Sequence, residues 1–131
     1  TLVAADKILP DGRQVHDYGE APAGLMMVDP AGRYSMQIYD MSRPAFAAGD
    51  KPKGTADEYR SAVLGASTHF GTMTVDETAH TLTLELKASA YPNQQGTRQV
   101  RVYALDGDVL SYRVPPRPDG SVAISVWRRI K

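Results

Sequence analysis

Residues 81–88 read Thr-Leu-Thr-Leu-Glu-Leu-Lys-Ala and place leucine at positions 82, 84 and 86, with a polar residue between each pair. Successive side chains of a β-strand point to opposite faces of a sheet, so this spacing puts the three leucines on one face and Thr83 and Glu85 on the other. One apolar face and one polar face are typical of an antiparallel strand that covers a core on one side. The segment therefore predicts a β-strand with one buried face.

The same period of two recurs along most of the chain, and turn sequences separate the segments that carry it. The turns contain Gly, Pro, Asn or Asp, which supply the positive or fixed φ angles that tight turns need. The apolar positions that we expect to face the core include Val100 and Val102 in one segment and Val122, Ile124 and Val126 in another. We predict eight strands, over residues 1–8, 24–28, 34–39, 69–75, 81–88, 97–105, 109–114 and 121–130.

One segment has the signature of a helix instead. Thr55 and Glu58 have the spacing of a capping box, in which each side chain accepts a hydrogen bond from the other residue's backbone N–H. We predict a helix of about three turns from residue 55 to residue 66, with Tyr59, Val63 and Leu64 on one face. Because this narrow apolar face needs a partner, and the Pro- and Gly-rich loop 43–54 permits the approach, we expect the helix to cover one opening of the sheet as a lid.

The composition excludes several classes of partner and chemistry. Fifteen Lys and Arg residues balance fifteen Asp and Glu residues, so no net charge favours nucleic acid, and no apolar run approaches the roughly 18 residues of a membrane helix. Cysteine is absent, and His16, His69 and His80 lack metal-site spacing, so we expect neither a disulfide nor a metal site. No nucleotide-binding or nucleophile motif occurs, so we expect no cofactor. The first residue, Thr1, is compatible with removal of an upstream segment such as a signal peptide, and neither compartment nor oligomeric state follows from the sequence.

The 131 residues are the usual size of one domain, and we expect residues 1–131 to form one. Eight short strands, one helix and no crossover helices indicate an all-β protein, either an up-and-down barrel or a strongly curled sheet. A two-sheet sandwich is the alternative.

Several motifs occur in a characteristic order along nearly the whole chain: Pro10-Asp11-Gly12-Arg13, Tyr18-Gly19, Gly24-Leu25-Met26, Asp29-Pro30-Ala31-Gly32-Arg33-Tyr34-Ser35-Met36-Gln37, His69-Phe70-Gly71-Thr72, Tyr91-Pro92-Asn93 and Val126-Trp127-Arg128-Arg129. In this order they resemble the bacterial and fungal lipocalin-like domain family. The resemblance implies an eight-stranded antiparallel lipocalin-like barrel with one short helix and an internal cavity. Members usually begin with a Gly-Thr-Trp-like segment, and this chain opens just after its place, which leaves barrel closure and the packing of Trp127 open.

The candidate binding residues are those expected to line such a cavity. Methionines adapt to irregular ligand shapes, tyrosine hydroxyls give a polar edge to an apolar wall, and a histidine could exchange a proton near neutral pH. Asn93 lies in a turn from which its amide could meet a ligand carbonyl. The candidates are Met26, Tyr34, Met36, Ile38, His69, Met73, Leu84, Tyr91, Asn93 and Tyr112.

Three functions are compatible with this sequence. The leading one is binding of a small, largely apolar molecule in the barrel cavity. The alternative is a cofactor-free isomerase or cyclase of secondary metabolism, because a few relatives in the family resemble such enzymes. In that case His69, Tyr34, Tyr91 or Asn93 would polarise the substrate. The third is an interaction module with a filled barrel, whose function would lie on loop 43–54. Two observations distinguish these functions: whether the barrel contains a cavity, and whether the His69 side chain points into it.

Overall fold

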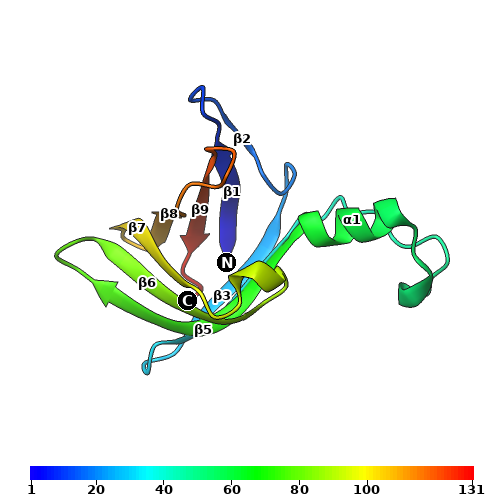
Figure 1. The fold of residues 1–131 in the computed structure, drawn as a ribbon. Coiled ribbons are helices and arrows are strands. Elements are labelled where there is room, and N and C mark those ends of the chain that lie inside the picture. Colours follow the sequence, from blue (N-terminus) through cyan, green and yellow to red (C-terminus); the bar gives the residue numbers. More distant parts are fainter.

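The computed structural model describes residues 1–131, which form one strongly curved antiparallel sheet of nine strands (Figure 1). The strand order is β2-β1-β9-β8-β7-β6-β5-β4-β3, so neighbours in the sheet are neighbours in the chain except where β1 meets β9, and the consecutive strands β2 and β3 form the two edges. The strands are β1 (Leu2–Ile8), β2 (Gln14–His16), β3 (Ala23–Val28), β4 (Arg33–Tyr39), β5 (Ala66–Asp76), β6 (Thr81–Ser89), β7 (Arg98–Asp106), β8 (Val109–Arg113) and β9 (Val122–Arg128). The helical elements are η1 (Lys51–Lys53), α1 (Ala56–Leu64) and η2 (Pro92–Gln94).

The prediction of an all-β antiparallel fold with one α-helix is confirmed, but the count of eight strands is wrong. The ninth strand is β2, which pairs with the end of β1, where Asp6 lies opposite His16. β2 has three residues, of which Val15 alone is apolar. Three residues are too few to show an alternating pattern, which explains why the sequence did not indicate this strand.

The sheet curls far enough to bring β1 close to the edge strand β3, but it does not close into a hydrogen-bonded barrel. The expected closed barrel is therefore wrong. The Thr1 hydroxyl donates to the carbonyl of Gly24 in β3 over 3.4 Å. A Cβ at Gly24 would lie 2.9 Å from Cβ of Leu2, so glycine permits this approach. No ladder joins β1 to β3, and β2 pairs with the same edge of β1 over residues 6–8. The result is a curled sheet with a seam between β1 and β3.

The concave face of the sheet holds the core. Leu82, Leu84 and Leu86 of β6 are 3%, 2% and 1% exposed, as their spacing predicted. The other buried apolar residues come from five further strands: Ala5, Tyr34, Met36, Ile38, Met73, Tyr112 and Trp127.

In β7 the inner face was predicted wrongly. Val100 and Val102 are 46% and 60% exposed, and they point outward. The concave side of this strand carries Gln99, Arg101 and Tyr103 instead, of which Arg101 is 3% exposed. An apolar alternation marks the inner face only where the interior is apolar, and here the interior side of the strand is polar.

The same error affects β9. Ser125 and Trp127 are buried, at 5% and 3% exposure, whereas Val122, Ile124 and Val126 on the other face are only partly buried. The register confirms this orientation, because Trp127 lies opposite Leu2 and Leu110, two residues that pack against the core.

The helix α1 has its predicted N-terminus but not its predicted position. Thr55 N–H donates to Glu58 Oε1 over 2.8 Å and Glu58 N–H donates to Thr55 Oγ1 over 3.2 Å, which completes the capping box. Figure 1 shows α1 projecting sideways from the sheet, and no residue of the helix is buried. The expectation that α1 is a lid is therefore wrong. No helix of the structure has the length and apolar character to cross a membrane.

Of the apolar face of α1, Tyr59 packs on the loop before the helix, whereas Val63 and Leu64 are 62% and 61% exposed. The rings of Phe46 and Tyr59 meet edge to face with centroids 5.3 Å apart. The Tyr59 hydroxyl donates to the carbonyl of Lys51 over 2.6 Å, and Glu58 Oε2 accepts from Ala47 N–H over 2.7 Å. Residues 46–59 are thus held together by their own contacts.

We expect Thr55→Ala to loosen α1 without unfolding the sheet. Loss of the cap should cost about 1 kcal/mol, and because α1 stands apart from the core, this cost should appear as roughly fivefold faster hydrogen exchange of the α1 amides. Thr78→Ala, in the exposed β5–β6 turn, is the control. A parallel loss of protection in β6 would show that α1 unfolds together with the sheet and would contradict the expectation.

Candidate functional site

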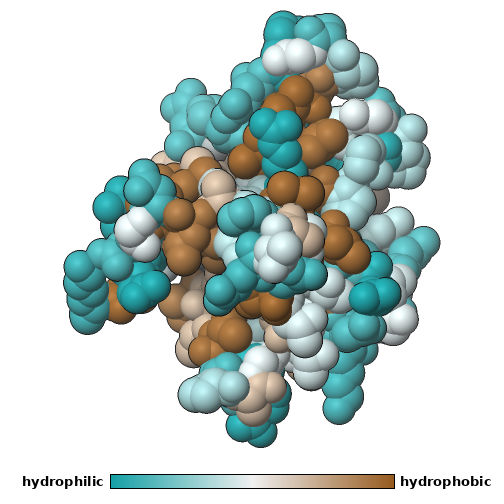
Figure 2. Space-filling model, turned by 90° about the vertical axis from the view of Figure 1, so that its left-hand side faces the viewer, coloured by the Kyte–Doolittle hydropathy of each residue, from teal (hydrophilic) through white to brown (hydrophobic).

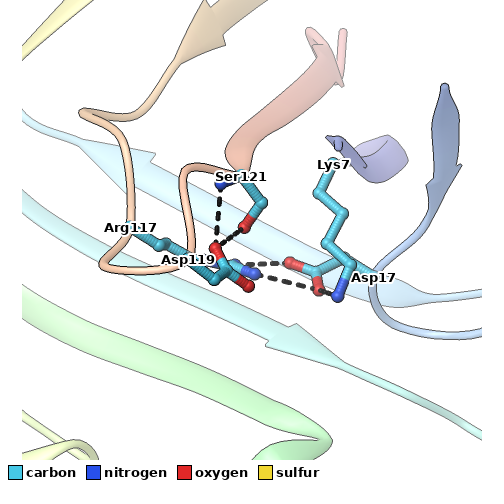
Figure 3. A network of polar contacts seen from close by, with 5 residues as sticks. All are labelled: Lys7, Asp17, Arg117, Asp119 and Ser121. Carbon is cyan, nitrogen blue, oxygen red and sulfur yellow. Dashed lines mark hydrogen bonds and ion pairs between the residues drawn. The ribbon is translucent and has the colours of Figure 1, made fainter. Parts of the chain in front are cut away.

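One end of the curled sheet is covered by a polar network (Figure 3). Asp17, which follows β2, accepts from both terminal nitrogens of Arg117 and lies 3.5 Å from Nζ of Lys7. Its side chain is 9% exposed, and its hydrogen bond raises the pKa of Arg117. Next to it, Asp119 accepts from the N–H and the hydroxyl of the fully buried Ser121 over 2.8 and 2.6 Å. These contacts join the segment after β2 to the β8–β9 loop.

The opposite end exposes apolar side chains, beside the β7–β8 hairpin, where Asp108 pairs with Arg129 and Lys131. The strands β3, β5 and β7 run in the same direction, and Val28, Val75 and Leu105 lie at their C-terminal ends. These side chains are on the concave side of the sheet, like Met26, Met73 and Tyr103 of the same strands. Val28, Val75 and Leu105 are 50%, 56% and 58% exposed. We call these three residues the hydrophobic rim. Figure 2, which faces the side with the β5–β6 and β7–β8 hairpins, shows hydrophobic side chains in several patches on this face, with hydrophilic ones between and around them.

Between the two ends the concave face contains a chain of buried polar side chains. The Tyr34 hydroxyl is 2.8 Å from His69 Nδ1, and a terminal nitrogen of Arg101 is 3.5 Å from His69 Nε2. Tyr34, His69 and Arg101 are 4%, 5% and 3% exposed. They come from β4, β5 and β7, and β6 between β5 and β7 supplies the leucines beside them.

Burial decides the protonation of this cluster. Desolvation, aided by the charge of Arg101, lowers the pKa of His69 to about 3, so the imidazole is neutral at pH 7. Desolvation also raises the pKa of Tyr34 to about 12. The guanidinium of Arg101 can only donate, so we assign the His69 proton to Nδ1, where it is donated to the oxygen of Tyr34, and leave Nε2 as the acceptor. In this arrangement the proton of the Tyr34 hydroxyl is not used by the cluster.

Arg101 is a buried cation without a carboxylate partner. Its Nε and one terminal nitrogen donate to Gln99 Oε1 over 3.2 and 2.8 Å, and its Cζ lies 4.9 Å from the centroid of the Tyr112 ring. No ion pair of the structure includes Arg101. Arginine stays protonated in proteins, so the interior carries one uncompensated positive charge.

Two further polar atoms of the interior have no hydrogen-bond partner within the protein: Tyr112 Oη and Trp127 Nε1. A buried donor without a partner costs about 1–3 kcal/mol, so native proteins rarely leave one unpaired. Tyr112 Oη and Trp127 Nε1 therefore leave two unused hydrogen-bond donors in the interior.

The structure brings most of the predicted site residues together and leaves two apart. Met26 is partly buried against the core, whereas Tyr91 is 55% exposed and Asn93 is exposed in η2, so neither lies on the concave face. Sequence reasoning missed Arg101 and Gln99. These two polar residues alternate with Val100 and Val102, and this alternation was the available signal that one face of the strand is polar. The predicted residues that are buried in the interior are Tyr34, Met36, Ile38, His69, Met73, Leu84 and Tyr112.

Three hollows lie at the surface, two of them over β-strands and one beside α1. One of about 340 Å³ lies over β4, β5 and β6, and its lining includes Met36 and His69 besides the outward residue Phe70. One of about 370 Å³ adjoins it and is lined by Met27, Val28 and Tyr34 among others. A third, of about 350 Å³, lies between Arg43, Phe46 and Ala62 beside α1. The buried apolar residues of the concave face pack as one cluster, so a guest among them has to displace some of these side chains. No group of three or more His, Cys, Asp or Glu side chains is arranged to hold a metal ion.

Comparison with known proteins agrees with this architecture. The family model described as a lipocalin-like domain matches residues 1–130. No curated protein and no solved structure matches the chain. The match covers nearly the whole sequence, and the curled antiparallel sheet with a core on its concave face is consistent with it. The chain therefore belongs to the lipocalin-like domain family.

Proposed function

We propose that this protein binds a small, largely apolar molecule on the concave face of its sheet, reached through the hydrophobic rim. The observation that carries the proposal is the contrast between the two ends: one is covered by the Asp17 and Arg117 network, and the other exposes Val28, Val75 and Leu105. Exposed apolar side chains surrounded by polar ones are typical of a binding site.

The residues behind the rim can make room for a guest. Met36 and Met73 belong to the core and Met26 packs against it. Methionine side chains repack readily because they are unbranched and flexible. The unpaired Tyr112 Oη and Trp127 Nε1 give a guest with oxygen atoms hydrogen bonds that the protein alone does not form.

Catalysis by the same cluster finds less support. A pKa of about 3 makes His69 a weak base, and a pKa of about 12 makes Tyr34 a weak acid at neutral pH. General acid–base catalysis is most effective when the catalytic pKa lies near the working pH. The pKa values of His69 and Tyr34 therefore favour binding over proton transfer.

Trp127 is the only tryptophan of the chain and is buried in the core, so its emission reports on the interior directly. We expect titration with dodecan-1-ol, dodecanoic acid or a small terpenoid alcohol to change this emission in a saturable way and to raise the melting temperature. If none of these probes changes the emission, the melting temperature or the heat of mixing, the proposed function is wrong.

A pair of variants in β7 tests the route of entry. Leu105→Lys places a charge on the hydrophobic rim, and Val102→Lys places the same charge on the convex face at a residue of similar exposure, 60% against 58%. We expect Leu105→Lys to weaken binding about tenfold, because a solvated ammonium opposes the passage of apolar groups, and Val102→Lys to leave it unchanged. Equal effects of the two variants would place the entry elsewhere.

A further inference from the structure

The uncompensated charge of Arg101 defines what kind of molecule this interior accepts. A buried guanidinium with neither a carboxylate partner nor the possibility of losing its proton is costly, and a fold normally pairs or avoids such a group. Here the charge lies on the concave side of β7 at 3% exposure, with Gln99 Oε1 as its close acceptor.

None of the side chains in contact with Arg101 carries a negative charge, and two of the groups linked to it have an unused hydroxyl proton. On β5, His69 is neutral; on β4, the proton of the Tyr34 hydroxyl is not used; on β8, Tyr112 Oη has no partner. Each is linked to Arg101 by a contact: His69 directly, Tyr34 through His69, and Tyr112 through its ring. The group that complements one cation and two O–H donors is an anionic oxygen acceptor.

A carboxylate fits this set better than a phosphate. Its single negative charge matches the single positive charge, and its two oxygens match the fork of a guanidinium. A phosphate monoester carries nearly two charges at pH 7 and would leave one of them uncompensated in the interior.

We propose that the ligand of this protein is an apolar monocarboxylic acid, whose carboxylate binds Arg101 while its apolar part extends toward the hydrophobic rim. This inference rests on the proposed function and specifies the ligand. Tyr34 and Tyr112 donate to the same carboxylate and orient it, and Gln99 holds the guanidinium in place from its other side.

The experiment compares dodecanoic acid with dodecan-1-ol, which has the same chain and no charge, at pH 7.5 by calorimetry and Trp127 emission. We expect the acid to bind the unmodified protein at least about tenfold more tightly than the alcohol, because a charge-assisted pair in the interior contributes more than a neutral hydrogen bond. Dodecyl phosphate is expected to bind more weakly than the acid.

The variant Arg101→Met keeps the length of the side chain and removes the charge. Because it also removes a buried cation without a counter-ion, the variant should fold, with a melting temperature of the free protein no lower than before. We expect it to lose the preference for the acid and to bind the alcohol as well as the unmodified protein does. Arg113→Met, an exposed arginine on β8, makes the same change in net charge and should retain the preference.

The outcomes separate the two proposals. If acid and alcohol bind the unmodified protein equally, or if Arg101→Met retains the preference, the assignment of Arg101 is wrong while binding of an apolar molecule stands. Tighter binding of dodecyl phosphate than of the acid overturns the choice of carboxylate. If no probe binds, both proposals fail. Preference for the acid in the unmodified protein and in Arg113→Met, together with its loss in Arg101→Met, supports the inference.

Discussion

Replacement of Leu84 by alanine is expected to lower the free energy of unfolding by about 2–5 kcal/mol, because three carbon atoms leave the centre of the core and the surroundings close the space only in part. Leu84 is 2% exposed and lies between Leu82 and Leu86 on the concave side of β6. Urea denaturation followed by Trp127 emission measures the change. We expect the slope of the unfolding free energy against urea concentration to stay the same.

Glu85→Ala is the matched control for this substitution. Glu85 is the next residue of β6, points outward and pairs with the exposed Arg98 over 3.3 Å. A surface ion pair contributes little, so we expect a change below about 1 kcal/mol. If Leu84→Ala falls in the same range as Glu85→Ala, the concave face does not hold the core as described.

The second large effect is a dependence of stability on pH caused by His69. Its pKa is about 3 in the folded protein and about 6.5 in the unfolded chain, so between these values the unfolded chain binds more protons. The stabilisation from neutral His69 is therefore complete above pH 6.5 and is lost as the pH falls toward 3. Between pH 7.5 and pH 5 we expect this residue alone to lower the free energy of unfolding by about 2 kcal/mol.

His69→Gln isolates this contribution, because an amide keeps the hydrogen bonding capacity and does not titrate. The fall in stability between pH 7.5 and pH 5 should be about 2 kcal/mol smaller in His69→Gln than in the unmodified protein. His80→Gln, at an exposed turn, should leave the fall unchanged. An equally steep fall in His69→Gln would mean that His69 titrates normally in the folded protein and is not buried as a neutral group.

Local sequence patterns were sufficient for the strands that alternate clearly. The leucines of β6 and the inward residues Tyr34, Met36 and Ile38 of β4 were placed correctly, because their apolar side chains mark the face that must leave water. The capping box of α1 was also predictable, since its two hydrogen bonds involve residues only three positions apart.

Long-range packing decided the features that the sequence left undetermined or indicated wrongly. The lid expectation failed because Phe46, and not the sheet, covers Tyr59. The strand β2 exists because β1 offers it a free edge over residues 6–8.

The sequence by itself determined that this chain forms an antiparallel sheet with turns at Gly-, Pro-, Asn- and Asp-containing segments, because backbone geometry and side-chain alternation are local properties. Only the tertiary structure decided which face of β7 and β9 is interior. In β7 the valines lie outside and Arg101 lies inside, because the register of neighbouring strands fixes the inward side whatever residue it carries. The charge that specifies the proposed ligand is therefore invisible to a search for apolar patterns, and it becomes apparent only when β4, β5, β7 and β8 bring Tyr34, His69, Arg101 and Tyr112 together.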